Sequence, residues 1–109
     1  MAILSVQIIP LIGLEPSYAA ADVGGDEFVN SGRDFIHVKN GHTSEQTVTM
    51  NSQTACSFGF DHDAAVAIPA SEERMIGPFP KNRFDDSNGK VLITYSGVTS
   101  LTIAVLRVP

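Results

Sequence analysis

Short runs of β-branched residues recur along nearly the whole chain, and they constrain its fold more than any other feature. Val, Ile and Thr favour strands because their branched side chains pack well on a pleated surface. No stretch has the 3.6-residue apolar period of an amphipathic helix. Seven runs therefore predict strands, at residues 3–9, 34–40, 45–51, 64–68, 73–77, 90–96 and 99–107.

Two of these runs alternate between apolar and small or polar residues. In "TVTM", Val48 and Met50 fall on one side of a strand and the two threonines on the other. In "AVAI", Val66 and Ile68 oppose two alanines in the same way. This period of two predicts half-buried strands that each have one face toward a core.

Turn signals fall between the predicted strands. "KNGH" places Asn40-Gly41 after the second strand, which predicts a turn with positive φ, and "SNGK" places Asn88-Gly89 before the sixth. "YSGVTS" places Gly97 between the last two strands and predicts a tight terminal hairpin. Together they predict an all-β, antiparallel β-sandwich of jelly-roll or Greek-key type, with a small closed β-barrel as the alternative.

Two segments do not fit as strands. Residues 10–33 form a connection that is long for a compact domain unless it is functional or contains a short strand. The two prolines of "GPFPKNRFDD" predict a crossing at a sandwich edge, with one helical turn at residues 80–84. The chain of 109 residues has room for one domain, in which residues 1–33 supply an N-terminal strand and an extended arm.

Charge and the N-terminus limit the partners and the location. The net charge of −5 repels phosphate backbones and anionic lipid, and no apolar window is long enough to span a bilayer, so we expect neither nucleic-acid nor membrane partners. No Lys or Arg precedes Arg33, although "YAAA" offers small residues for cleavage. We therefore expect no signal peptide, and the single Cys56 cannot form an intramolecular disulfide.

One acidic cluster invites a metal interpretation. In "FDHDAA", Asp61, His62 and Asp63 are consecutive, but neighbouring strand residues point to opposite faces and hard cations take six or more oxygen ligands. We expect a solvated loop there and no metal site. His37 and His42 flank the predicted Asn-Gly turn, where we expect surface or edge residues.

Residue patterns for catalysis are also missing from the sequence. Cys56 has no basic residue near it in sequence to favour a thiolate, so we expect a small buried side chain. The serines form no nucleophile elbow, and the glycine pair of "ADVGGDEF" lacks the strand–loop–helix context of a phosphate-binding loop. We expect no catalytic residue and no cofactor, and hence not an enzyme.

The strings "GLEPSYAAADVGGDEF", "GRDFIHVKNG" and "ERMIGPFPKNRFDDSNGKVLITYSGVTSLTIAVLRV" resemble a family of small proteins encoded among the head genes of tailed bacteriophages and in prophage remnants. The most specific segments are the Gly77-Pro78-Phe79 corner, Phe84 with Asp85, and the C-terminal strand pair. The resemblance implies a virion structural protein, and specifically a capsid decoration (cement) protein. It also places the opening stretch in the mature domain.

The resemblance implies a capsid-surface location, synthesis in the host cytoplasm, and the major capsid protein as partner. We expect a homo-oligomer, with a trimer favoured because capsid lattices offer three-fold positions. The alternative is a carbohydrate- or cell-surface-binding β-sandwich module. The candidate interface residues are Ile9, Leu11, Ile12, Leu14 and Tyr18, which would otherwise fill the bottom of the sandwich. The residues with an expected structural role are Asn40, Gly41, Gly77, Pro78, Phe79, Phe84 and Gly97, with both phenylalanines buried.

Overall fold

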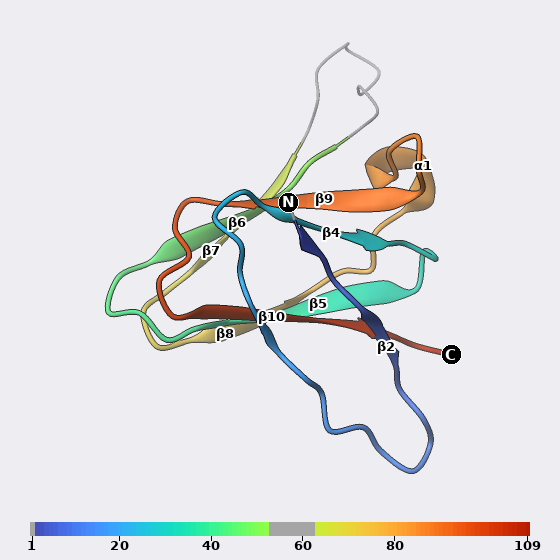
Figure 1. Cartoon of the computed structure of the whole chain (residues 1–109), viewed down its shortest axis with the longest axis horizontal. Helices are drawn as coiled ribbons and strands as arrows, with labels where there is room; N and C mark the ends of the chain where they lie inside the picture. The colour runs from blue at the N-terminus through green and yellow to red at the C-terminus, as the bar shows by residue number, and fades with distance from the viewer. Residues whose placement is uncertain (1, 53–62) are drawn as a thin grey trace.

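The computed structural model describes residues 2–52 and 63–109, and these residues form two β-sheets packed face to face (Figure 1). The first sheet has the strand order β1 (Ala2–Ile3), β4 (Asp26–Val29), β9 (Lys90–Tyr95), β6 (Gln46–Met50), β7 (Ala64–Ile68). The second has the order β2 (Val6–Ile8), β10 (Leu101–Arg107), β5 (Asp34–Asn40), β8 (Glu73–Ile76), with β3 (Ala19–Ala20) also paired to β10. A short helix, α1 (Lys81–Phe84), lies in the connection from β8 to β9.

The expected β-sandwich is confirmed, and the described strands divide between two sheets rather than closing into one barrel. The predicted boundaries of β5 and β7 match the structure, and those of β6, β8, β9 and β10 differ from it by at most two residues. The predicted helical turn is also present, with Pro80 as the residue before α1. Val48 and Met50 are buried and the threonines beside them are half-buried, as their alternation predicted.

The prediction of one N-terminal strand at residues 3–9 is wrong. β1 pairs in parallel with β4 in the first sheet, whereas β2 pairs in parallel with β10 in the second. The chain crosses between the layers at Leu4, which packs against the core. This segment bridges the open side of the sandwich and adds one parallel strand to each sheet. Both sheets are therefore mixed rather than purely antiparallel.

Residues 10–33 contain two short strands, β3 and β4. The sequence pattern allowed a short strand in this segment but did not place one. The segment "DEFV" of β4 begins with two acidic residues, which are depleted in strands. Asp26 and Phe28 nevertheless point inward and are fully buried. A buried carboxylate conceals the alternation that would have identified this strand.

The predicted terminal hairpin is absent, because β9 and β10 lie in different sheets, and the Asn40-Gly41 segment likewise joins strands of different sheets, β5 and β6. Neither Gly41 nor Gly97 adopts a positive φ. A Cβ on Gly97 would lie 2.9 Å from Oε1 of Gln46, so a larger residue there would displace the end of that side chain. The predicted turn before β9 is confirmed, with Gly89 at φ 74°.

Asn40 has a structural role different from the one expected. Its side chain is buried, and its Nδ2 donates hydrogen bonds to the carbonyl oxygens of Ile68 (2.9 Å) and Ser44 (3.0 Å). Its Oδ1 accepts from Nε2 of Gln46 at 2.8 Å. Buried polar groups need such partners. The amide of Asn40 therefore joins the end of β5 to the ends of β6 and β7, in the other sheet.

Candidate functional site

The N-terminal arm, residues 9–18, leaves the edge of the second sheet and returns to it. Ile9 donates its backbone N–H to the carbonyl of Arg107 (3.0 Å), and β3 pairs antiparallel with the other end of β10. At the tip, Gly13 donates to the carbonyl of Pro10 (3.1 Å) and has φ 99°. In Figure 1 the arm is the blue loop that extends below the second sheet.

The base of the arm is closed by one side chain. Nε2 of Gln7 donates to the carbonyl of Ser17, and the backbone N–H of Ser17 donates to Oε1 of Gln7, both at 2.8 Å. Gln7 therefore reproduces the paired hydrogen bonds of a strand across ten residues of chain. Two converging bonds fix the two ends of the arm relative to each other.

A second anchor joins the arm to the outer face of the second sheet. The hydroxyl of Tyr18 lies 2.6 Å from Nδ1 of His37, whose Nε2 lies 3.1 Å from Oε1 of Glu73. Nζ of Lys39 is 4.1 Å from the centroid of the Tyr18 ring. His37 is only 7 % exposed, so the expectation of a surface or edge histidine is wrong. The reason is that β5 has a strand on each side and that Tyr18 packs against the imidazole.

The structure separates the five candidate interface residues into a tip and a base. Leu11 and Ile12 are fully exposed, with relative exposures of 108 % and 97 %. Ile9, Leu14 and Tyr18 are half-buried, and Tyr18 holds the end of the arm against His37. Only the two tip residues are therefore free to contact another molecule with their whole side chains.

Sequence reasoning missed two further apolar residues beside the arm. Ile8 is 56 % exposed at the end of β2, and Val108 is 50 % exposed just after β10. Ile8 is paired with Arg107, the residue before Val108, so the two lie close together at the sheet edge. Their position depends on the parallel pairing of the two chain ends, which a local pattern does not reveal.

The "GPF" corner is set by close backbone approach and by aromatic packing. A Cβ on Gly77 would lie 2.7 Å from Cβ of Phe35, and Gly77 has φ 140°. The expected burial of Phe79 and Phe84 is confirmed, at 2 % and 4 % exposure. Their rings meet edge to face with centroids 5.5 Å apart, and Phe79 also packs on Phe28. The Gly77–Pro78 peptide bond is cis.

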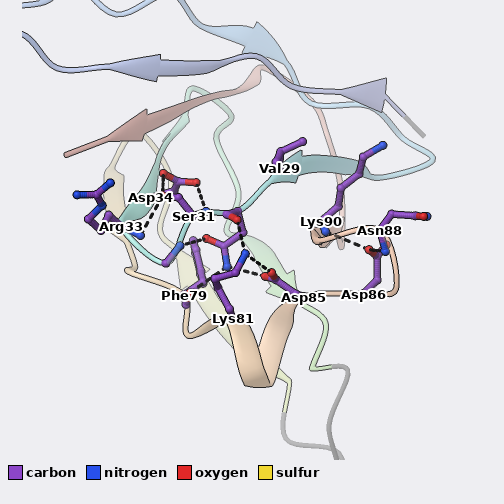
Figure 2. Close-up of polar contacts among 12 residues, drawn as sticks. Val29, Ser31, Arg33, Asp34, Phe79, Lys81, Asp85, Asp86, Asn88 and Lys90 are labelled. Atoms are coloured by element: carbon purple, nitrogen blue, oxygen red, sulfur yellow. Dashed lines mark hydrogen bonds and ion pairs between the residues drawn. The ribbon is translucent and has the colours of Figure 1, made fainter. Parts of the chain in front are cut away.

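A polar network lies beside this corner and joins α1 to the end of β4. Nζ of Lys81 donates to Oδ2 of Asp85 at 2.8 Å, one helical turn along the chain. Oδ1 of Asp85 accepts at 2.7 Å from the amide of Asn30, which is 55 residues away in sequence. Figure 2 shows Lys81, Asp85 and Phe79 converging at this point.

Of the "DHD" cluster, Asp61 and His62 lie outside the described residues, and so does Cys56. Oδ1 of Asp63 accepts a hydrogen bond from the backbone N–H of Ser52 at 2.7 Å. Within residues 2–52 and 63–109, no three His, Cys, Asp or Glu side chains are grouped so that they could hold a metal ion. The same ranges contain no helix long and apolar enough to cross a membrane.

A buried carboxylate lies at the other end of the core. Oδ2 of Asp26 accepts from the hydroxyl of Tyr95 (2.6 Å) and from the backbone N–H of Asp22 (3.2 Å). Its Oδ1 is buried and has no hydrogen-bond partner among the described residues. Burial, followed by the hydrogen bond to Asp26, raises the pKa of Tyr95 far above its ordinary value.

Comparison of the chain with protein-family models, with curated proteins and with solved structures gives no match. The interpretation of the site therefore depends on its geometry and chemistry. The feature that is hardest to account for in an isolated domain is the braced arm with two fully exposed branched side chains at its tip.

Proposed function

We propose that this chain is a structural protein of a tailed-bacteriophage virion, a decoration protein that binds the major capsid protein on the head surface. The observation that carries the proposal is the full exposure of Leu11 and Ile12 at the tip of the arm. Each of these side chains would gain about 1.5–3 kcal/mol on moving from water into an apolar pocket. This gain favours a partner with such a pocket.

The bracing of the arm supports a binding role over a merely irregular loop. The Gln7–Ser17 pair closes its base, and the Tyr18–His37 contact fixes its return to the sheet. A binding segment that is already ordered loses less conformational entropy on association, so it binds more tightly for the same contacts. Glu15 is the only charged residue of the arm, which suits an apolar pocket.

The family resemblance of the sequence supports a capsid as the source of this pocket. A head surface presents many identical copies of one protein around local symmetry axes. A trimer of this domain would present three arms to three equivalent sites, and linked binding events raise the overall affinity well above that of one arm. Sedimentation velocity of the purified chain tests the trimer independently of capsid binding.

The central experiment mixes the full chain with undecorated phage heads and measures co-sedimentation. Replacing both Leu11 and Ile12 by Ser should weaken binding by about 100-fold or more, since two apolar anchors are lost. The matched control is Val23→Ser, which removes another strongly exposed apolar side chain, at 87 % exposure, from a turn outside the arm. Circular dichroism should show that both variants are folded.

Each result has a defined meaning. Wild-type chain that never sediments with heads contradicts the capsid role. A folded Leu11→Ser/Ile12→Ser variant that binds as well as the wild type contradicts the arm as the contact. Loss of binding in that variant, with binding retained by Val23→Ser, supports the proposal.

A further inference from the structure

The side-chain amide of Asn30 is buried and held in one orientation. Asn30 is 3 % exposed, and its Nδ2 donates to the carbonyl of Phe79 (3.0 Å) and to Oδ1 of Asp85 (2.7 Å). Its Oδ1 accepts from the backbone N–H of Gly32 at 3.0 Å. Because the nitrogen faces two acceptors and the oxygen faces a donor, the reverse orientation of the amide is disfavoured.

The amine of Lys81 is held against the same residue. Nζ donates to the backbone carbonyl of Asn30 and to Oδ2 of Asp85, both at 2.8 Å. One carboxylate thus contacts an amine through one oxygen and a carboxamide nitrogen through the other. A lysine, an asparagine and a bridging aspartate are the groups needed for amide exchange between two side chains.

We propose that Lys81 and Asn30 form an intramolecular amide cross-link. In this step Nζ of Lys81 attacks Cγ of Asn30, the new Nζ–Cγ bond forms, the Cγ–Nδ2 bond breaks and ammonia leaves. The reaction converts an amine and a primary amide into a secondary amide and ammonia, so it is balanced without an oxidant, a reductant or a cofactor.

Asp85 occupies the position of a proton shuttle for this exchange. Oδ2 contacts the nitrogen that must lose a proton, and Oδ1 contacts the nitrogen that must gain one before it leaves. The carboxylate ends the reaction in the state in which it began. Asp85 is therefore the catalytic residue of the proposed step, in contact with both reacting nitrogens.

The backbone N–H of Gly32 completes the arrangement. Negative charge develops on Oδ1 of Asn30 when the carbonyl carbon becomes tetrahedral, and a fixed N–H donor at 3.0 Å stabilises it. The carbonyl of Phe79, a residue that is itself buried, accepts from the same amide and holds its nitrogen on the opposite side from this donor.

The chemistry of the step determines how its rate depends on pH. An amine nitrogen attacks a carbonyl carbon only through a free electron pair, and more alkaline buffer favours that form of any amine. The cross-link should therefore form faster in alkaline buffer than at neutral pH. Once formed, it joins the end of β4 to α1 across 51 residues of chain, and the inference does not depend on the capsid role.

Intact-mass spectrometry of the folded full chain tests the proposal directly. Incubation at about pH 9 should reduce the mass by one ammonia, about 17 Da. Trypsin does not cleave after an acylated lysine, so the digest should contain residues 1–33 joined to residues 75–83 as one branched peptide. Fragmentation of that peptide should place the bond on Lys81 and Asn30.

Two variants separate this reaction from succinimide formation, which also releases ammonia and is favoured at the Asn-Gly sequences of this chain. Lys81→Arg keeps the positive charge but removes the nucleophile, and Asp85→Asn removes the shuttle, so neither should yield the branched peptide. Lys90→Arg is the matched control, because Lys90 pairs with Glu27 at 3.5 Å in the first sheet and should not be needed.

The branched peptide in the wild type and in Lys90→Arg, but not in Lys81→Arg or Asp85→Asn, supports the cross-link. A wild-type chain that keeps its full mass after prolonged alkaline incubation overturns it. Mass loss in the wild type without a branched peptide also overturns it, because the ammonia then comes from succinimide.

Discussion

The carboxylate of Asp34 and the guanidinium of Arg107 form a two-point ion pair at one end of the second sheet. Nε of Arg107 donates to Oδ1 at 2.6 Å, and Nη2 donates to Oδ2 at 3.1 Å. The two residues are directly paired in the β5–β10 ladder, and Asp34 has no exposed surface. Ser31 adds hydrogen bonds from its backbone N–H and its hydroxyl, both at 2.9 Å.

This pair predicts acid sensitivity. Burial alone would raise the pKa of Asp34, but the bonds from Arg107 and Ser31 outweigh burial and hold the pKa below its ordinary value of 3.8. A lowered folded-state pKa gives stability that is present above pH 3.8 and lost as the pH falls through the folded-state pKa. Asp34→Asn should cost about 3 kcal/mol at neutral pH, because it leaves a partly buried guanidinium without its anion.

Urea unfolding as a function of pH measures this effect. The difference between wild type and Asp34→Asn should shrink in acid, where the wild-type carboxyl is protonated as well. The control is Glu72→Gln, because the side chains of Glu72 and its partner Arg74 are 52 % and 41 % exposed; this change should stay within about 0.5 kcal/mol. A pH-independent difference between wild type and Asp34→Asn would show that the ionised pair is not responsible.

Tyr95 predicts a separate loss of stability in alkali. Its pKa is raised above the ordinary value of 10.0, first by burial and then by the hydrogen bond to Asp26. A raised folded-state pKa gives stability that is complete below pH 10 and is lost above it, because the unfolded chain releases the proton more readily. The free energy of unfolding should fall by about 1.4 kcal/mol per pH unit from this residue alone.

Tyr95→Phe should remove that contribution to the alkaline slope, at a cost of about 1 kcal/mol near neutral pH for the lost hydrogen bond. Urea unfolding between about pH 8 and 11 gives both values. Equal slopes for wild type and variant would contradict the assignment to Tyr95.

The "GPF" corner predicts large losses from single substitutions. Phe79→Ala and Phe84→Ala should each cost about 3–5 kcal/mol, as is usual for core aromatics. Met75→Ala, at a position 66 % exposed on β8, is the control and should stay within about 0.5 kcal/mol. Thermal and urea unfolding measure all three. Two phenylalanine variants as stable as the control would mean that this corner does not close the core.

Local patterns were sufficient to predict some elements but not others. β5 and β7 were predicted with their correct ends because their alternation is intrinsic to the run. β1 and β2 were predicted as one strand. The crossing at Leu4 depends on which sheet edges are free to pair, and a run of apolar residues carries no information about those edges. The Asn40-Gly41 segment was interpreted as a turn with positive φ and the Gly97 segment as a hairpin, because their residue types favour tight turns. In the folded protein the chain passes to the opposite sheet at both segments.

The same limit applies to the candidate site. Leu11 and Ile12 could be selected from the sequence because apolar residues in an irregular stretch have no strand to bury them. The spacing of Lys81 and Asp85 is also visible in the sequence, as one helical turn. Their contact with Asn30, and that of Tyr18 with His37, could not be predicted, since each joins residues that only the folded sandwich brings together.

Gln7 allows the order of the arm to be tested separately from its chemistry. Gln7→Ala removes both hydrogen bonds that close the base of the arm and leaves Leu11 and Ile12 in place. Because the bonds are exposed, global stability should fall by no more than about 1 kcal/mol. Hydrogen exchange at the amide of Ser17, which donates one of these bonds, should accelerate strongly.

Binding to phage heads should then weaken by about 10-fold, less than for Leu11→Ser/Ile12→Ser, because only the ordering cost of the arm has changed. Ser44→Ala, a polar substitution at an exposed position outside the arm, should leave binding unchanged. If Gln7→Ala speeds exchange at Ser17 but binds heads as well as the wild type, the arm does not need to be ordered before it binds. If it weakens binding as much as removal of both tip side chains, Gln7 itself belongs to the contact surface.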